Sequence, residues 1–108
     1  MQKKDMPAGA LVLLILRVLR GGPLHGYAIA QRIHTLSADE LRVEEGSLYP
    51  ALQKILVKGW VTASWGTSET GRKVRFYKIT RAGLTQLEAE ASDYDRLNRA
   101  IQAILHNA

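Results

Sequence analysis

Apolar residues recur at helical spacing along the first third of this 108-residue chain. Residues 8–19 are apolar on nearly every side, which predicts a helix that is covered all round. Residues 24–36 continue the helical pattern after the turn Gly21-Gly22-Pro23. The turn Ser37-Ala38-Asp39 then ends this second helix. Its expected buried side consists of Leu24, Tyr27, Ala28, Ile33 and Leu36.

A third helix is predicted to open at Gly46-Ser47-Leu48-Tyr49-Pro50, because proline is tolerated within the first turn of a helix. Three- and four-residue spacing defines its inward side, which is Leu48, Leu52, Ile55 and Leu56. Gly59 is expected to end the helix in a left-handed conformation. The opposite, outward side carries Ser47, Tyr49, Pro50, Gln53 and Lys54.

The alternation then changes to that of strands over residues 60–65 and 74–79. The polar segment 66–73 between them contains two glycines, so these residues predict a β-hairpin with a flexible tip. Thr80 is a suitable N-cap for the last helix, although Gly83 weakens its first turn.

The last helix carries apolar residues at alternating spacings of three and four, which is a heptad seam. The seam consists of Leu84, Leu87, Ala91, Tyr94, Asn98, Ile101 and Leu105, with Leu97 and Ile104 alongside. A helix of about 25 residues is about 37 Å long, more than so small a domain can cover. We therefore expect the seam to pair two chains as a homodimer, with Asn98 as a polar layer that favours one register.

Charge adds a candidate partner to this picture. The net charge is +5, and residues 72–81 contain five basic residues and no acid, whereas residues 84–108 contain four acids and two bases. A local cluster of cations on a hairpin favours binding to nucleic acid over a merely solvated surface. The chain has no cysteine and three scattered histidines, so we expect no metal site and no other cofactor. The apolar run at residues 10–16 is too short to span a membrane, and a cytoplasmic location is expected.

Three helices followed by a basic hairpin is the order of a winged helix-turn-helix domain. We therefore predict a mainly α fold with a small β-hairpin, in which residues 1–80 bind double-stranded DNA and residues 81–108 form a dimerisation helix. The start of the third helix offers unpaired N–H groups to a phosphate, and Gln53 and Lys54 can reach base edges. The predicted DNA-binding residues are Ser47, Tyr49, Pro50, Gln53, Lys54, Arg72, Lys73 and Arg75.

Two segments resemble enzyme motifs, but each lacks residues that its motif requires. The segment 66–73 approaches a phosphate-binding loop, but Arg72 stands at the lysine position, Val74 follows in place of serine or threonine, and the segment leads into a strand. Ser47 has no glycine two residues later, so it does not form a nucleophile elbow. We expect no catalytic residues and no enzymatic activity.

The aromatic residues have two interpretations each. Tyr27 is expected in the core, and Tyr49 either in the core or at a phosphate. Trp60 and Trp65 either pack the hairpin against the core or line a ligand pocket between subunits. We favour core packing for Trp65, and the alternatives stay open for Trp60.

Four segments in this order resemble PadR-type regulators: His25-Gly26-Tyr27, residues 45–52 (EGSLYPAL), Gly59-Trp60-Val61 and residues 77–83 (YKITRAG). The resemblance covers residues 11–87. It implies a homodimeric bacterial repressor, with Ser47, Tyr49 and the basic hairpin at the DNA and the last helix pairing the subunits. Because a two-fold axis would relate the two recognition helices of such a dimer, we expect its operator to be an inverted repeat. Because it has a single short C-terminal helix, the chain resembles the short subgroup of this family. The resemblance also adds a small aromatic effector as a candidate partner, although no residue here selects one.

A rival hypothesis assigns the winged helix to protein interaction or small-molecule binding, without sequence-specific DNA binding. The basic hairpin is then incidental. A DNA footprint separates the two hypotheses, because only the first predicts a discrete protected site.

Overall fold

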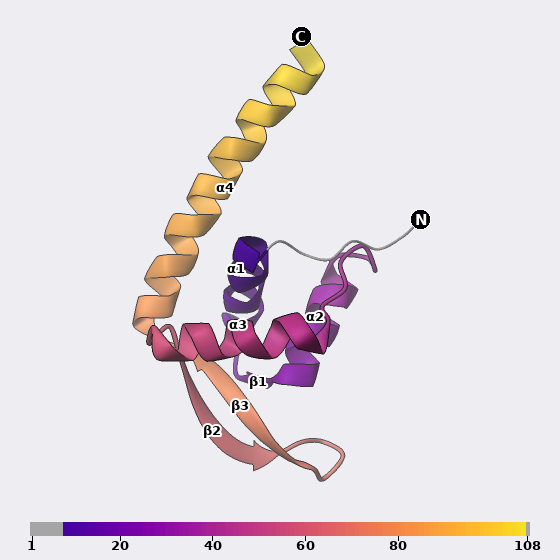
Figure 1. Ribbon diagram of the computed structural model, residues 1–108, viewed down its shortest axis with the longest axis vertical. Coiled ribbons are helices and arrows are strands. Elements are labelled where there is room, and N and C mark those ends of the chain that lie inside the picture. The colour runs from indigo at the N-terminus through magenta and orange to yellow at the C-terminus, as the bar shows by residue number, and fades with distance from the viewer. Residues whose placement is uncertain (1–7, 108) are drawn as a thin grey trace.

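The computed structural model describes residues 8–107, so the ends of the two predicted regions, residues 1–7 and 108, lie outside the described residues. The described part contains four helices and one small antiparallel sheet (Figure 1). This arrangement confirms the predicted mainly α fold. The elements are α1 (Ala8–Leu19), β1 (Leu24–His25), α2 (Gly26–Leu36), α3 (Glu45–Val57), β2 (Val61–Thr67), β3 (Lys73–Ile79) and α4 (Arg81–Asn107).

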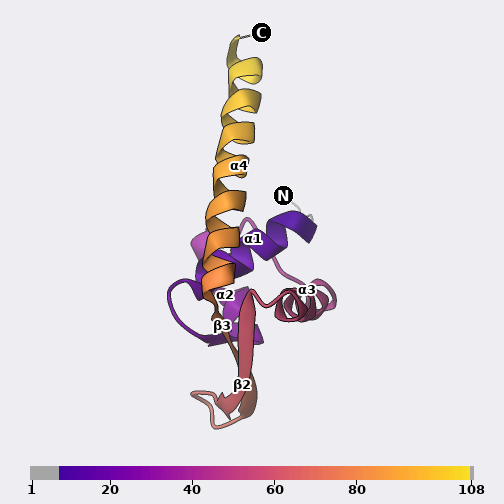
Figure 2. The same ribbon diagram turned by 90° about the vertical axis from the view of Figure 1, so that its left-hand side faces the viewer.

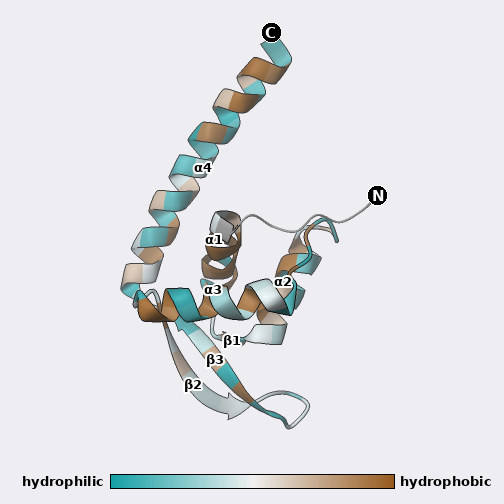
Figure 3. Ribbon diagram, in the orientation of Figure 1, coloured by the Kyte–Doolittle hydropathy of each residue, from teal (hydrophilic) through white to brown (hydrophobic). Residues whose placement is uncertain are grey.

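Helix α1 is the centre of the hydrophobic core, as its apolar composition predicts. It packs against α2, α3, α4 and β3, and Figure 3 shows it as a strongly hydrophobic helix. Leu11, Ile15, Leu16 and Leu19 are all buried. Their contacts with three helices and a strand hold the small domain together, because apolar surface removed from water is the main favourable term in folding.

The second helix begins later than predicted, and its predicted buried side is confirmed for Ile33 but not for Tyr27 and Leu36. Leu24 and His25 form a strand that pairs with β3, so the expected two-stranded hairpin is a three-stranded sheet of order β1-β3-β2. Ile29 and Ile33 face the core, whereas Tyr27 and Leu36 are exposed. Position 27 is about 200° from position 29 around a helix, so one side cannot bury both.

The inward side of α3 matches the prediction. Leu48, Leu52 and Ile55 are buried and Leu56 is half-buried. The helix begins at Glu45, however, which places Pro50 beyond the first turn and corrects that part of the prediction. Since proline has no N–H, the carbonyl of Gly46 lacks the donor that position 50 would otherwise supply. Gly59 follows the helix with a φ of +77°, as predicted.

Strands β2 and β3 and their connecting loop, residues 68–72, form a projecting hairpin that we call the wing. Both strands are slightly longer than predicted. The wing and α4 project from the helical body in opposite directions (Figures 1 and 2). The four acids of residues 84–108 therefore lie on the arm that points away from the basic wing.

Thr80 caps α4 as predicted and joins it to the preceding elements. Its hydroxyl donates to the Gly59 carbonyl over 2.7 Å and accepts the Gly83 N–H over 3.0 Å. Gly83 is buried, and a Cβ at this position would overlap the Trp60 carbonyl oxygen. Glycine is therefore required here by close packing. None of the described helices has a stretch long and apolar enough to cross a membrane.

Candidate nucleic-acid interface

The outward side of α3 is open to solvent along its whole length. All five residues predicted there, Ser47, Tyr49, Pro50, Gln53 and Lys54, are exposed. Their exposure follows from the burial of Leu48, Leu52 and Ile55, which holds the opposite side of the helix against the core. A helix seated in this way presents one polar side outward and keeps it rigid.

The start of α3 is less suited to an anion than the sequence suggested. The Ser47 N–H is not free, because it donates to the Glu44 carbonyl over 3.0 Å. Two carboxylates, Glu44 and Glu45, also stand at this end, and Glu44 pairs with Arg42 at 3.3 Å. Negative charge at the helix start opposes a phosphate. The expectation that Ser47 offers an unpaired N–H was therefore wrong.

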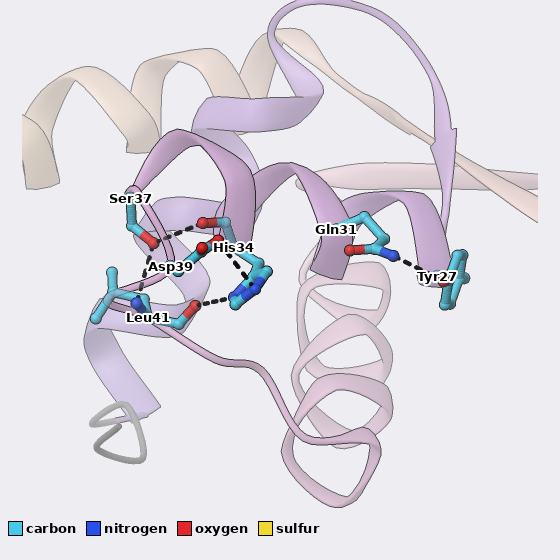
Figure 4. Close-up of polar contacts among 6 residues, drawn as sticks. All are labelled: Tyr27, Gln31, His34, Ser37, Asp39 and Leu41. Atoms are coloured by element: carbon cyan, nitrogen blue, oxygen red, sulfur yellow. Dashed lines mark hydrogen bonds and ion pairs between the residues drawn. The ribbon is translucent and has the colours of Figure 1, made fainter. Parts of the chain in front are cut away.

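Side-chain contacts hold the turn between α2 and α3, in which Ser37 and His34 bind the backbone of Leu41 (Figure 4). The Ser37 hydroxyl accepts the Leu41 N–H over 3.0 Å, and His34 Nδ1 lies 3.2 Å from the Leu41 carbonyl. The other ring nitrogen of His34 lies 3.1 Å from a carboxylate oxygen of Asp39. Ala38 and Asp39 both have positive φ angles, which residues with a Cβ rarely adopt. These contacts hold the turn in a conformation that it would not favour alone.

Tyr49 is half-exposed, with 49% of its surface open to solvent, and its inner side rests on the start of α2. A Cβ at Gly26 would lie 3.1 Å from the Tyr49 hydroxyl oxygen and 3.2 Å from a ring carbon. The tyrosine is therefore neither a core residue nor a free surface residue. Its ring is fixed against α2 and part of it stays accessible.

Two of the predicted DNA-binding cations of the wing, Lys73 and Arg75, lie on one face. The β2–β3 register places alternate residue pairs on the same face of the sheet. The face that enters the core continues outward through the pairs Val61–Ile79, Ala63–Tyr77, Trp65–Arg75 and Thr67–Lys73. Arg72 lies in the loop beyond them. The opposite face of β3 includes the exposed Lys78.

Trp65 does not pack against the core, which corrects the interpretation favoured for it. It is 67% exposed, far out on the wing, and the Lys73 ammonium lies 5.2 Å from its ring centre. Arg75 is directly opposite Trp65 on the same face, and its guanidinium lies 6.0 Å from the ring of Tyr77, one step further inward. Trp60, whose role was open, is half-buried against the core. The alternation of β2 was the available sign that Trp65 is exposed, because Trp65 shares a face with the buried Val61 but lies four residues further from the body.

These elements enclose a groove of about 1150 Å³, which we call the wing groove. The start of α2, the start of α3 and the wing form its walls. Of the predicted DNA-binding residues, the groove brings together Tyr49, Arg72, Lys73 and Arg75, whereas Ser47, Pro50, Gln53 and Lys54 lie outside it on α3. The lining also contains Trp65, Tyr27, Gln31 and Arg32, which the sequence did not single out for this site.

Tyr27 was expected in the core but lies exposed at the wing groove. Gln31 donates a hydrogen bond of 2.7 Å to the Tyr27 hydroxyl, one turn along α2 (Figure 4). Arg32 follows and adds a positive charge. The four-residue spacing of Tyr27, Gln31 and Thr35 was the available signal for a polar side of this helix.

The predicted seam of α4 divides into two parts in a single chain. At the base, Leu87 is only 3% exposed because it joins the core of its own chain, and Leu84 and Ala91 are half-buried. Further out the seam is exposed at Tyr94, Asn98, Ile101 and Leu105, and Leu97 and Ile104 are exposed beside it. In this structure only the outer part of the seam is exposed, so only that part could contact a second chain without a change in the fold.

Comparisons with known proteins add independent information. The family model described as "Transcriptional regulator PadR-like family" matches residues 15–89. Uncharacterized protein X of Lysinibacillus sphaericus is 26% identical over 105 residues, which cover 97% of this chain and 96% of that protein. A PadR family transcriptional regulator from Eggerthella lenta has a TM-score of 0.76 at 25% identity, covering 93% of this chain and 85% of that one. A PadR-like transcriptional regulator from Bacillus cereus has a TM-score of 0.77 at 24% identity, covering 91% and 93%.

Proposed function

The chain belongs to the PadR-like family of transcriptional regulators, and we propose that it is a homodimeric repressor that binds an inverted-repeat operator in double-stranded DNA. The observation that carries this proposal is the wing groove, in which the cationic face of the wing stands opposite the start of α3. Such a repressor acts on DNA in the bacterial cytoplasm.

Helix α3 is the element that would read the operator sequence. The major groove admits an α-helix, and the exposed side of α3 carries side chains that can reach base edges. Gln53 can bind adenine through two hydrogen bonds, and Lys54 can donate to guanine. The buried side of α3 supports this role, because rigid seating fixes the register of both side chains.

The wing would supply most of the phosphate contacts. Arg72, Lys73 and Arg75 lie on or beyond one face of the wing, remote from the carboxylates of α4. The carboxylates of Glu44 and Glu45 weaken the start of α3 as an alternative phosphate site. Affinity should therefore depend on the wing cations and fall steeply as salt is added.

The outer part of α4 would pair two subunits. Its exposed apolar side chains, among them Tyr94, Ile101 and Leu105, lie on a helix that extends well beyond the body (Figure 2). Pairing through this arm gives a two-fold axis, with a wing and an α3 helix on either side. Operator half-sites should then lie about one helical turn, or about 34 Å, apart.

The test is a fluorescence anisotropy titration with DNA from upstream of the protein's own gene, repeated at several salt concentrations. We expect the logarithm of the association constant to fall linearly with the logarithm of salt concentration, and the slope to shrink by about 0.9 for each phosphate contact removed. The variant Arg72→Ala/Lys73→Ala/Arg75→Ala should lose most of the affinity and most of the slope.

Lys78→Ala is the matched control, because Lys78 is an exposed cation on the opposite face of the same strand. It should leave both affinity and slope nearly unchanged. A footprint on the same DNA should show one discrete protected site with two-fold symmetry. A folded dimer that protects no site but copurifies with a partner protein would contradict the proposal and favour an interaction module.

A further inference from the structure

The wing carries a row of aromatic and cationic side chains on one face. On one face of the wing, Tyr77 lies nearest the core, Trp65 and Arg75 lie directly opposite each other one step further out, and Lys73 lies one step beyond them. Each cation lies over a ring: Arg75 over Tyr77 at 6.0 Å and Lys73 over Trp65 at 5.2 Å. Tyr77 is buried and anchors the row to the body.

Trp65 is the exposed aromatic member of this row. An indole that is 67% exposed leaves a large apolar surface in water. Burial of that surface by a partner is favourable in proportion to the area removed from water. Trp65 also lines the wing groove, so a partner that enters the groove would contact it.

The cations beside Trp65 restrict the identity of that partner. Lys73 and Arg75 flank the indole on the same face, and the loop residue Arg72 also lines the groove. The groove lining also includes the carboxylates of Glu45 and Glu69, so the positive charge is concentrated at Arg72, Lys73 and Arg75. A partner that contacts this part of the wing is expected to be negatively charged at two or more points and apolar between them. The sugar–phosphate walls of the DNA minor groove have this composition, since deoxyribose carbons lie between the phosphates.

We propose that Trp65 is a DNA-contacting and affinity-determining residue, an inference that rests on the proposed operator binding. The exposed edge of the indole enters the minor groove next to the major groove that takes α3, and it contacts deoxyribose and base edges there. Apolar side chains are known to enter the minor groove in this way. The ring also holds the Lys73 ammonium by a cation–π interaction, which positions it for a flanking phosphate.

Salt dependence separates this role from a simple electrostatic one. Trp65→Ala should lower operator affinity by about tenfold at fixed salt, because a buried aromatic contact is lost. It should change the salt slope by less than one, because the indole displaces no counterions. Lys73→Ala should instead reduce the slope by about 0.9 per phosphate contact. Trp65→Phe should retain part of the affinity.

Fluorescence provides a second readout that does not depend on the alanine variant folding. In Trp60→Phe protein the emission comes from Trp65 alone, and operator DNA should protect it from quenching by acrylamide. Trp65→Phe, which keeps Trp60, is the control and should show little protection. Suppose that the wild type binds operator DNA in a salt-sensitive way. Equal affinity in Trp65→Ala, or Trp65 emission that the DNA does not protect, would then overturn this inference and leave the proposed function intact. Absence of operator binding by the wild type would overturn the proposed function itself.

Discussion

The ring of Tyr49 on α3 lies against the Cα of Gly26 at the start of α2, so close that a Cβ on Gly26 would come within 3.1 Å of the tyrosine hydroxyl oxygen. Gly26 is buried and Tyr49 is half-exposed. The contact joins two segments of the chain that bear the family resemblance. It also fixes the one aromatic side chain that α3 presents to the wing groove.

Gly26→Ala should disturb Tyr49 more than it disturbs the fold. The added methyl group pushes the ring outward by a few tenths of an ångström, while alanine is favoured over glycine in a helix by about 0.5–1 kcal/mol. We expect operator affinity to fall several-fold with little change in thermal stability. A double-mutant cycle with Tyr49→Ala checks the cause, because the effect of Gly26→Ala on affinity should vanish when the ring is absent.

Gly83→Ala should destabilise the protein in spite of the better helix propensity of alanine. The new methyl group would overlap the backbone carbonyl of Trp60, which cannot move as a side chain can. We expect a loss of about 1–3 kcal/mol in the free energy of unfolding, measured by urea denaturation. Gly9→Ala is the matched control in α1, where a Cβ meets no neighbour within 4 Å. The control should be neutral or stabilising, and equal effects at both sites would show that packing at Gly83 is unimportant.

Thr80→Ala should loosen the junction between the wing and α4. It removes both the bond to the Gly59 carbonyl and the cap on the Gly83 N–H. The expected cost is about 1–2 kcal/mol of unfolding free energy. Thr80→Ser keeps the hydroxyl and should restore most of the stability. If serine proves as destabilising as alanine, the hydroxyl is not the group that matters.

Ile101→Asp should produce folded monomers, because Ile101 lies on the exposed outer part of the α4 seam. Sedimentation velocity and circular dichroism on the same sample measure both properties. Persistence of a dimer in this variant would contradict the proposed role of α4. Gln102→Asp, next to it on the helix but off the seam, is the control and should remain dimeric.

Leu87→Ala is expected to act differently from Ile101→Asp although both residues belong to the predicted seam. Leu87 is 3% exposed within its own chain, so its truncation leaves a cavity in the core. We expect a loss of about 2–5 kcal/mol in unfolding free energy, seen as a lower denaturation midpoint. A variant that is as stable as the wild type would show that Leu87 is not a core residue.

The features that repeat along the chain were predictable. The hydrophobic spacing of Leu48, Leu52 and Ile55 predicted the inward side of α3, and that side determined which residues of α3 are exposed. Gly59 and Thr80 were predicted from local backbone and capping preferences, which depend on near neighbours only. The positive charge of the wing was likewise visible from the composition of one segment.

Contacts between distant segments were not predictable in the same way. Leu24 and His25 continue a helical pattern, but the free edge of β3 pairs with them as a strand. Tyr27 and Trp65 were both expected to pack inward because they are large and aromatic. Their exposure depends on where the body of the protein ends, and local spacing gave only a partial signal of it, in the polar neighbours of Tyr27 along α2 and in the distance of Trp65 from Val61 along β2.

By itself the sequence determined the order of the four helices and the hairpin, the side of α3 that faces the core, and the cationic character of the wing, because each follows from short-range periodicity and composition. Only the tertiary structure decided that Tyr49 rests on Gly26, that Leu87 is used within its own chain, and that Trp65 stands beside Lys73 and Arg75 in an open groove. The physical reason is that these relationships depend on pairing register and on the limits of the core, both of which are set by contacts between segments far apart in the chain.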